Sequence, residues 1–167
     1  RSDGNRLKVF RHDNEDSTSL SGNHITALLE DRHGQLWVAT EHYGVDRYDP
    51  RTERFTHVRI EGAFASAHDL APRTLREDAE GNIWVLGKFG MLSVITGGPS
   101  GKGASGSPQP VLQAAASVRG DLQLPDTVRS LLFTPQGDLW LASNVGLLIQ
   151  GTTAHGARAS SRWPVPQ

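Results

Sequence analysis

The chain has 167 residues, which is enough for one hydrophobic core, and its 17 lysine and arginine residues nearly balance its 18 acidic residues. A net charge of −1 excludes an electrostatic attraction of the whole chain to nucleic acid or to an anionic membrane. Because the chain has no cysteine, disulfides, thiolate metal sites and a cysteine nucleophile are excluded, and no apolar run approaches the roughly 20 residues of a membrane span.

The first predicted element is a short strand at residues 5–11. Its pattern around Phe10 resembles the pattern around Phe55, so we interpret it as the last strand of a preceding repeat unit. The chain opens on Arg1 and in the middle of a unit, so we expect it to be a piece of a longer protein. Residues 12–23 are rich in Asp, Ser and Asn and are predicted to form a loop.

A strand pattern with a central tryptophan then occurs three times, at residues 34–40, 81–87 and 137–143. Strand alternation places each Trp on one face and its apolar neighbours on the other, so both faces of the strand are expected to be buried. A first strand and a four-residue hairpin turn precede each copy, and a glycine opens a third strand after it. A fourth, shorter strand is predicted at 54–58 and at 111–113.

The spacing of these copies is typical of a propeller. Trp37 and Trp84 are 47 residues apart, and Trp84 and Trp140 are 56 apart. The longer spacing is explained by residues 97–110, where 11 of 14 residues are Gly, Ser or Pro, and this insert is expected to be disordered. Four strands per unit and a period in the mid-forties predict β-propeller blades.

We therefore predict an all-β fold, a β-propeller segment of about three four-stranded antiparallel blades, as a single partial domain at 1–167. Its first element is the last strand of a preceding blade at 5–11. Blade one is expected at 25–58, blade two at 73–114 around the insert, and blade three at 128–163. The outer strand of blade three is expected near Arg162 and Trp163.

The first copy resembles a known repeat. Residues 19–31 read Ser-Leu-Ser-Gly-Asn-His-Ile-Thr-Ala-Leu-Leu-Glu-Asp, and the pattern continues through 34–40 and 44–50. This stretch resembles the two-component regulator propeller repeat, which builds the sensor region of bacterial hybrid histidine kinases and of some diguanylate cyclases. The other two copies match at their strand cores. The resemblance implies a non-catalytic sensor domain in signal transduction, periplasmic and part of a membrane-anchored parent protein.

Two other functions remain open: a metal-dependent propeller lyase, with a His, an acid and a divalent metal at the central face, and a protein-binding propeller scaffold. None of the seven histidines forms an i, i+4 or His-x-His pair, so no metal site is predicted. Residues 101–106 match G-x-G-x-x-G, but Ser107-Pro108-Gln109-Pro110 follows instead of a helix, so no cofactor is predicted.

Candidate binding residues follow from the positions of loops in a propeller. Ligands usually meet the face formed by the connections from a fourth strand to the next first strand and from a second strand to a third. Here these loops carry aromatic residues that could stack on a saccharide. Arg73 and Arg129, at the equivalent starts of two innermost strands, could pair with an acid, although ordinary rim residues are the alternative interpretation. The candidates are His24, His42, Tyr43, Arg73, Lys88, Phe89, Arg129 and Asn144.

The expected partners are a small molecule, with a saccharide as one class, and further blades. Three blades fall short of the roughly four to eight that a closed propeller needs. A second copy of the chain in a homodimer, or the remaining blades of a longer parent chain, would complete the ring. No nucleic-acid partner is predicted.

Overall fold

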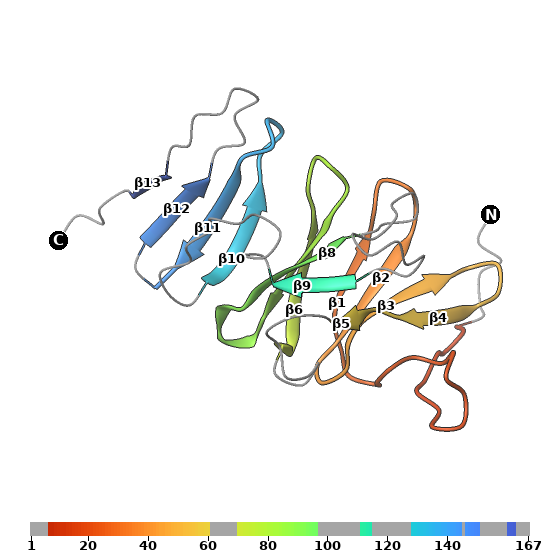
Figure 1. Ribbon diagram of the computed structural model, residues 1–167. Helices are drawn as coiled ribbons and strands as arrows, with labels where there is room; N and C mark the ends of the chain where they lie inside the picture. The colour runs from red at the N-terminus through yellow and green to blue at the C-terminus, as the bar shows by residue number, and fades with distance from the viewer. Residues whose placement is uncertain are drawn as a thin grey trace.

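The computed structural model describes residues 7–60, 70–96, 111–114, 128–144, 146–150 and 160–162. Its strands form three sheets that follow one another along the chain, with blade two between the other two (Figure 1). In each blade the first strand pairs with the second, the second with the third and the third with the fourth. This up-and-down order is that of a propeller blade, so the predicted all-β propeller segment is confirmed.

Blades one and three have four strands each, and all neighbouring strands within them are antiparallel. Blade one consists of β1 (Ile25–Glu30), β2 (Leu36–Thr40), β3 (Gly44–Asp49) and β4 (Arg54–His57). Blade three consists of β10 (Val128–Phe133), β11 (Leu139–Ser143), β12 (Gly146–Gln150) and β13 (Ser160–Arg162). The outer strand β13 lies where the sequence predicted it.

Blade two has the same four strands and a fifth at its outer edge. Its strands are β6 (Pro72–Glu77), β7 (Ile83–Gly87), β8 (Leu92–Thr96) and β9 (Val111–Ala114), with the 3-10 turn η1 (Lys88–Gly90) between β7 and β8. The additional strand, β5 (Arg59–Ile60), follows blade one in the sequence but pairs in parallel with β9. The chain leaving blade one therefore covers the outer edge of blade two.

An aspartate organises the hairpin turn between the first and second strands. The Asp31 carboxylate accepts hydrogen bonds from the backbone N–H groups of His33 and Gln35, both at 2.9 Å. Asp78 accepts the same two bonds one repeat later. The glycine that ends each turn has a positive φ, which a residue without Cβ adopts at no steric cost: 74° at Gly34, 86° at Gly81 and 88° at Gly137.

The tryptophans of the second strands form the contacts between blades. Trp37 is fully buried between blades one and two, in one cluster with Leu75, and Trp84 is fully buried between blades two and three, in one cluster with Leu131. Trp140 is only partly buried. The prediction that both faces of the Trp strand are buried is thus correct for the first two copies and wrong for the third, because no described blade covers that face of blade three.

The two buried indoles are also hydrogen bonded. Trp37 Nε1 donates to Asp31 Oδ2 at 2.9 Å, and Trp84 Nε1 donates to Asp78 Oδ2 at 2.8 Å. Each turn aspartate therefore holds its hairpin with one carboxylate oxygen and the inter-blade core with the other.

Blade three lacks this arrangement. Thr134 stands at the aspartate position, and its hydroxyl accepts a hydrogen bond from the backbone N–H of Asp138 at 3.1 Å. The Trp140 indole N–H is buried without a hydrogen-bond partner among the described residues. A buried donor without a partner lowers stability, so the third copy of the repeat is the weakest at this position.

The predicted strand at 5–11 is wrong over residues 7–11, which form no strand. A strand needs a hydrogen-bonded neighbour, and no strand pairs with this segment in the described part of the chain. The segment instead places the Phe10 ring edge-on against Tyr48 and Phe55, with ring centroids at 5.2 and 5.5 Å. The predicted insert at 97–110 and Trp163 lie outside the described residues.

Candidate functional site

Each first strand has one extra residue near its start. Ile25 pairs with Thr40 while Ala27 pairs with Ala39, so residue 26 of β1 has no partner on β2, and the same shift occurs in β6 and β10. A β-bulge of this kind re-aims a side chain and is frequent beside binding sites. The bulged residues are Thr26, Arg73 and Arg129.

In blade one the bulged residue joins two blades. The Thr26 hydroxyl donates a hydrogen bond at 2.6 Å to the backbone carbonyl oxygen of Pro72, which begins β6. The bulged residue of blade one is uncharged, whereas those of blades two and three are arginines.

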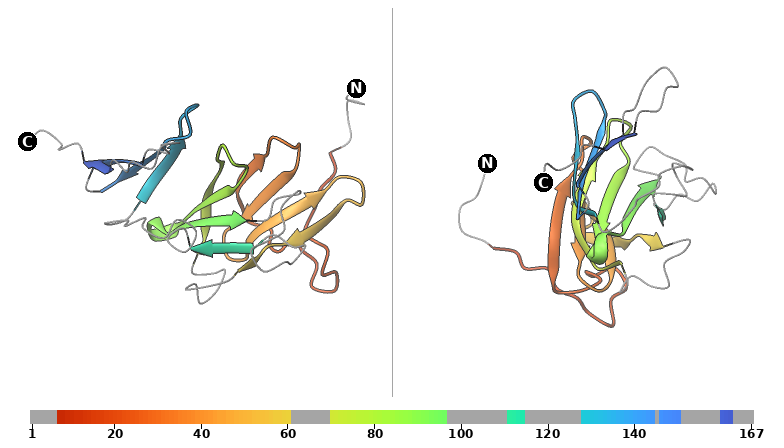
Figure 2. Two further views of the ribbon diagram at one scale, coloured as in Figure 1. Left: turned by 45° about the horizontal axis from the view of Figure 1, so that its top comes forward. Right: turned by 90° about the vertical axis from the view of Figure 1, so that its left-hand side faces the viewer.

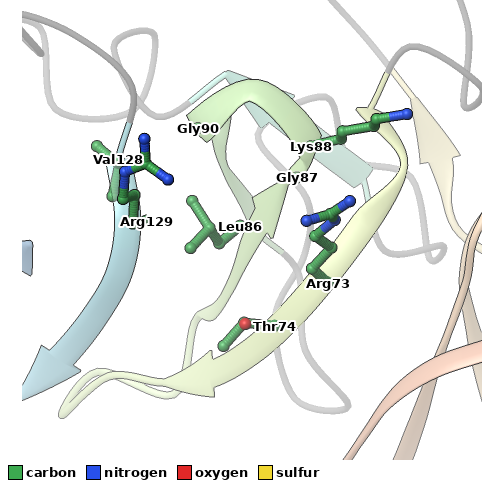
Figure 3. Close-up of a pocket in the computed structure, with 8 residues that line it drawn as sticks. All are labelled: Arg73, Thr74, Leu86, Gly87, Lys88, Gly90, Val128 and Arg129. Carbon is green, nitrogen blue, oxygen red and sulfur yellow. The ribbon is translucent and has the colours of Figure 1, made fainter. Parts of the chain in front are cut away.

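The bulged arginines line a pocket between blades two and three. The pocket has a volume of about 410 Å³, and its walls come from the start of β6, the end of β7, η1 and the start of β10 (Figure 3). Eight residues line it: Arg73, Thr74, Leu86, Gly87, Lys88, Gly90, Val128 and Arg129.

Two arginine side chains line this pocket from opposite sides. Figure 3 shows Arg73 on β6 and Arg129 on β10 on opposite sides of Leu86, whereas the Lys88 amine points away from both. Both arginines are exposed, and none of the lining residues is acidic. Arginine is always charged, so the two groups repel, and an anion between them would replace that repulsion with charge-assisted hydrogen bonds.

The wall at the end of β7 requires a glycine. A Cβ on Gly87 would lie 2.1 Å from the backbone oxygen of Leu70, which leaves no room for a side chain. A hydrogen bond of 3.0 Å from the backbone N–H of Lys88 to the carbonyl oxygen of Ala71 holds the same segment in place. The connection into blade two thus packs tightly against the turn that carries Lys88.

His24 and His42 lie around Glu41 at the corresponding turn of blade one. His24 Nδ1 is hydrogen bonded to the Glu41 carboxylate, and His42 Nε2 lies 3.6 Å from it. The hydrogen bond with His24 is the largest cause lowering the pKa of Glu41, and the charge of Lys88 acts in the same direction. These histidines belong to a separate polar cluster and do not line the pocket.

Tyr43 and Asn144 do not line the pocket either. Tyr43 is 59% exposed and its ring stacks on that of His12, with centroids 6.1 Å apart. Asn144 is exposed in the turn between β11 and β12. Phe89 is the middle residue of η1, and its side chain lies outside what the structure describes. Of the eight candidates, the structure brings Arg73, Lys88 and Arg129 together in one pocket.

Sequence reasoning missed the apolar and backbone parts of the pocket, including Leu86 and Val128. A signal for the bulge exists in the spacing of apolar residues in the first strands. Val128 and Leu131 are both buried although they are three residues apart, whereas residues on one face of a regular strand are two apart. That spacing requires an extra residue between them, and the bulge points the side chain of this extra residue in a new direction.

A buried aspartate joins the N-terminal segment to blade one. Asp46 is 0% exposed, accepts hydrogen bonds from the backbone N–H and the hydroxyl of Ser21, both at 2.8 Å, and is hydrogen bonded to His57 Nδ1 at 2.8 Å. In a Ser-His-Asp triad the histidine stands between the nucleophile and the acid. Here the acid stands between the serine and the histidine, so we interpret the cluster as structural.

Within the described ranges, no three His, Asp or Glu side chains form a group that could hold a metal ion. His68 and His155 lie outside those ranges. No helix among the described residues is long and apolar enough to cross a membrane.

Residues 19–42 match the family described as two component regulator propeller. The match begins in the connection before β1 and ends in the turn after β2. It confirms the resemblance found in the first copy of the repeat. No curated protein matches the sequence.

Solved structures that are similar to the chain include two extracellular domains. One is the extracellular domain of a protein described as a hybrid two-component system from B. thetaiotaomicron, with a TM-score of 0.60 and 20% identity over 93% of this chain. The chain spans 19% of that structure's length. The other, described as the extracellular domain of a one-component system from the same organism, has a TM-score of 0.41 and 18% identity, covering 94% of this chain and 27% of its own.

Proposed function

We propose that this chain is a non-catalytic, ligand-sensing segment of a propeller in the extracytoplasmic part of a two-component signalling protein. The propeller fold and the match of residues 19–42 to a two component regulator propeller support this proposal. A periplasmic position within a membrane-anchored parent protein belongs to the same proposal.

We further propose that the ligand is a small anion held between Arg73 and Arg129. The observation that carries this proposal is the pair of arginines, on the bulges of successive blades, that line opposite sides of a pocket without an acidic lining residue. Each guanidinium can donate two parallel hydrogen bonds to a carboxylate or another oxyanion. The volume of about 410 Å³ is within the range of small-molecule sites, so an acidic saccharide fits.

An anion in this position would also supply a relay. Arg73 belongs to blade two and Arg129 to blade three, so a bound anion contacts both blades at once. Binding would favour the arrangement in which the two inner strands hold the anion between them. A ligand that binds one arrangement better than another shifts the population toward it, which is the physical requirement for sensing.

Isothermal titration calorimetry with glucuronate, glucose and inorganic sulfate tests the proposal. Glucuronate and glucose share the sugar ring and differ by the carboxylate, so we expect binding of glucuronate and not of glucose. The affinity for the anion should fall as ionic strength rises, because salt screens the exposed arginines.

Arg73→Gln and Arg129→Gln should each weaken glucuronate binding about tenfold or more, the effect of losing one charge-assisted hydrogen bond. Arg51→Gln is the matched control, since Arg51 is 91% exposed and lies in the turn between β3 and β4. Equal binding of glucose and glucuronate, unchanged affinity in both pocket variants, or no binding of either anionic probe would contradict the proposal.

A further inference from the structure

One apolar residue of blade one is exposed although its counterparts are buried. Leu28 of β1 is 62% exposed, whereas Leu75 of β6 is 1% exposed and Leu131 of β10 is 3% exposed. Leu75 packs in the cluster of Trp37, and Leu131 packs in the cluster of Trp84, so each buried leucine faces the preceding blade. The face of blade one that carries Leu28 is therefore the face that a preceding blade covers in the rest of the molecule.

The N-terminal segment covers only the outer part of this face. Leu20 packs with Val38 and Phe55, and the backbone N–H of Phe55 in β4 donates to the carbonyl oxygen of Thr18 at 2.8 Å. Figure 2 shows this segment at the end of the row of blades that lies opposite to blade three. Leu28 on the innermost strand stays outside the cover.

At the junction of blades one and two, an arginine clamps one turn to the next. The Arg32 guanidinium pairs with the Glu77 carboxylate and donates to the carbonyl oxygens of Asp78 and, at 2.7 Å, Ala79. The backbone N–H of Arg32 donates to Glu77 Oε2 at 2.9 Å. The second residue of the hairpin turn in blade one is thus bound to the last residue of the first strand in blade two.

The junction of blades two and three lacks both members of this pair. Ala79 stands at the position of Arg32, and Phe133 stands at the position of Glu77. Phe133 packs its ring against that of Trp84, with centroids 5.5 Å apart. The junction of blades one and two thus has both the basic turn residue and the acidic residue at the strand end, and the junction of blades two and three has neither.

Glu30 is the counterpart of Glu77 in blade one. It is exposed, and its carboxylate makes no hydrogen bond or ion pair with any residue in the described ranges. Its neighbours on the same face, Leu28 and Val38, pair directly across β1 and β2. We propose that this face docks a further blade of the same repeat type, one that carries arginine at the second position of its first hairpin turn.

In a second copy of this chain, the blade available for docking is blade three, and it does not have that arginine. The uncovered face of blade three presents Leu132, which is 57% exposed, and the partly buried Trp140, so its apolar part could meet Leu28. Its second turn residue, however, is Pro135, which has no charge and no backbone N–H to donate. The proposed occupant is therefore a different blade, and self-association is the competing outcome of the test.

Pro135→Arg converts blade three into a docking blade of the proposed kind, in a turn whose counterpart already holds Arg32. In static light scattering we expect the Pro135→Arg chain to self-associate about tenfold more tightly than the wild type, as a charge-assisted pair provides. The double variant Pro135→Arg/Glu30→Gln should return to the wild-type affinity. Wild-type association as tight as that of Pro135→Arg, or a gain that survives Glu30→Gln, would overturn the proposal.

A longer variant tests docking within one chain. Inserting a duplicate of residues 25–71 before Ile25 places the Arg32 of the duplicate beside Glu30 of the original, with the connection found between blades one and two. Glu30→Gln in the original should lower the urea midpoint of this longer protein and leave that of the wild type unchanged. A duplicate that carries Arg32→Ala is the matched control and should abolish the effect; the same effect in all three proteins would overturn the proposal.

Discussion

At the scale of single residues, the turn aspartate is hydrogen bonded both to its own hairpin and to the adjacent tryptophan. Asp31 is 6% exposed and accepts hydrogen bonds from two backbone N–H groups of its turn and from the Trp37 indole. A buried carboxylate is stable only when such donors replace its hydration. The same residue therefore closes the hairpin and fixes the orientation of the Trp that separates two blades.

The third repeat offers a direct test, because Thr134 replaces the aspartate. We expect Thr134→Asp to stabilise the chain by about 1 kcal/mol, since it supplies an acceptor for the unpartnered indole N–H of Trp140. The shift of the urea midpoint measures the effect. Thr134→Ser keeps the hydroxyl and should change stability by less than about 0.5 kcal/mol. A lower midpoint for Thr134→Asp than for Thr134→Ser would contradict this account.

At the scale of elements, the two ends of each first strand have different tasks. The start is bulged, and in β6 and β10 it directs an arginine into the pocket. The end contacts the preceding blade: Glu77 of β6 binds the turn residue Arg32, and Phe133 of β10 packs against Trp84 of β7. The middle of the strand carries the inter-blade core. The ends can therefore differ between blades without disturbing the packing.

The clamp at the first junction should contribute measurably to stability. Arg32 is 45% exposed, so its ion pair with Glu77 is screened, but its bonds to two backbone carbonyls add to it. We expect Arg32→Ala to lower the free energy of unfolding by about 1 kcal/mol in urea denaturation. Arg51→Ala, at a side chain that is 91% exposed, should be neutral, and equal effects of the two substitutions would argue against the clamp.

The cores of the strands could be predicted from the sequence because each copy repeats the same alternation behind a glycine turn. The bulge was missed because it changes the phase of a strand only at its first residues, where the three-residue spacing of Val128 and Leu131 signals it. The repeat alignment placed Arg73 and Arg129 at equivalent positions of successive strands. Their position on opposite sides of one pocket depends on the bulge and on the separation of two blades, neither of which the pattern of a single strand specifies.

The failure at residues 7–11 has a different origin. The pattern around Phe10 is that of an outer strand, but a strand also needs a neighbour with which to pair. Without one among the described residues, the apolar side chain packs against Tyr48 and Phe55 while the backbone stays irregular. The candidate His24 precedes β1, and His42 and Tyr43 lie in the turn between β2 and β3, but local hydrogen bonds and ring stacking hold them around Glu41 and His12 instead.

At the scale of the whole molecule, blade two is more completely buried than blades one and three. Blade two has a neighbour on both faces, and Ile83, Trp84 and Val85 are each at most 1% exposed. Blades one and three each have one face that no described blade covers, where Leu28 and Leu132 are exposed. The same repeat position therefore has a different energetic weight in each blade.

Tryptophan deletions measure this difference. We expect Trp84→Ala to cost about 3 to 5 kcal/mol, as the loss of a fully buried large aromatic side chain does. Trp140→Ala should cost less than about 2 kcal/mol, because its side chain is already partly in solvent and its N–H has no partner. Guanidinium denaturation of the two variants compares them directly. Equal losses would mean that the far face of blade three is covered in solution.

The parallel pairing of β5 with β9 has a consequence for how the chain opens transiently. If β9 separates from β8, then β5, which pairs with β9 and directly follows blade one in the sequence, is released from blade two as well. In native-state hydrogen exchange, amides of blades one and two should therefore share one opening event, while blade three, whose β13 pairs only with β12, opens by itself. An anion bound by Arg73 and Arg129 would connect these two cooperative units. Slower hydrogen exchange at the amides of blade three would then indicate that the anion is bound.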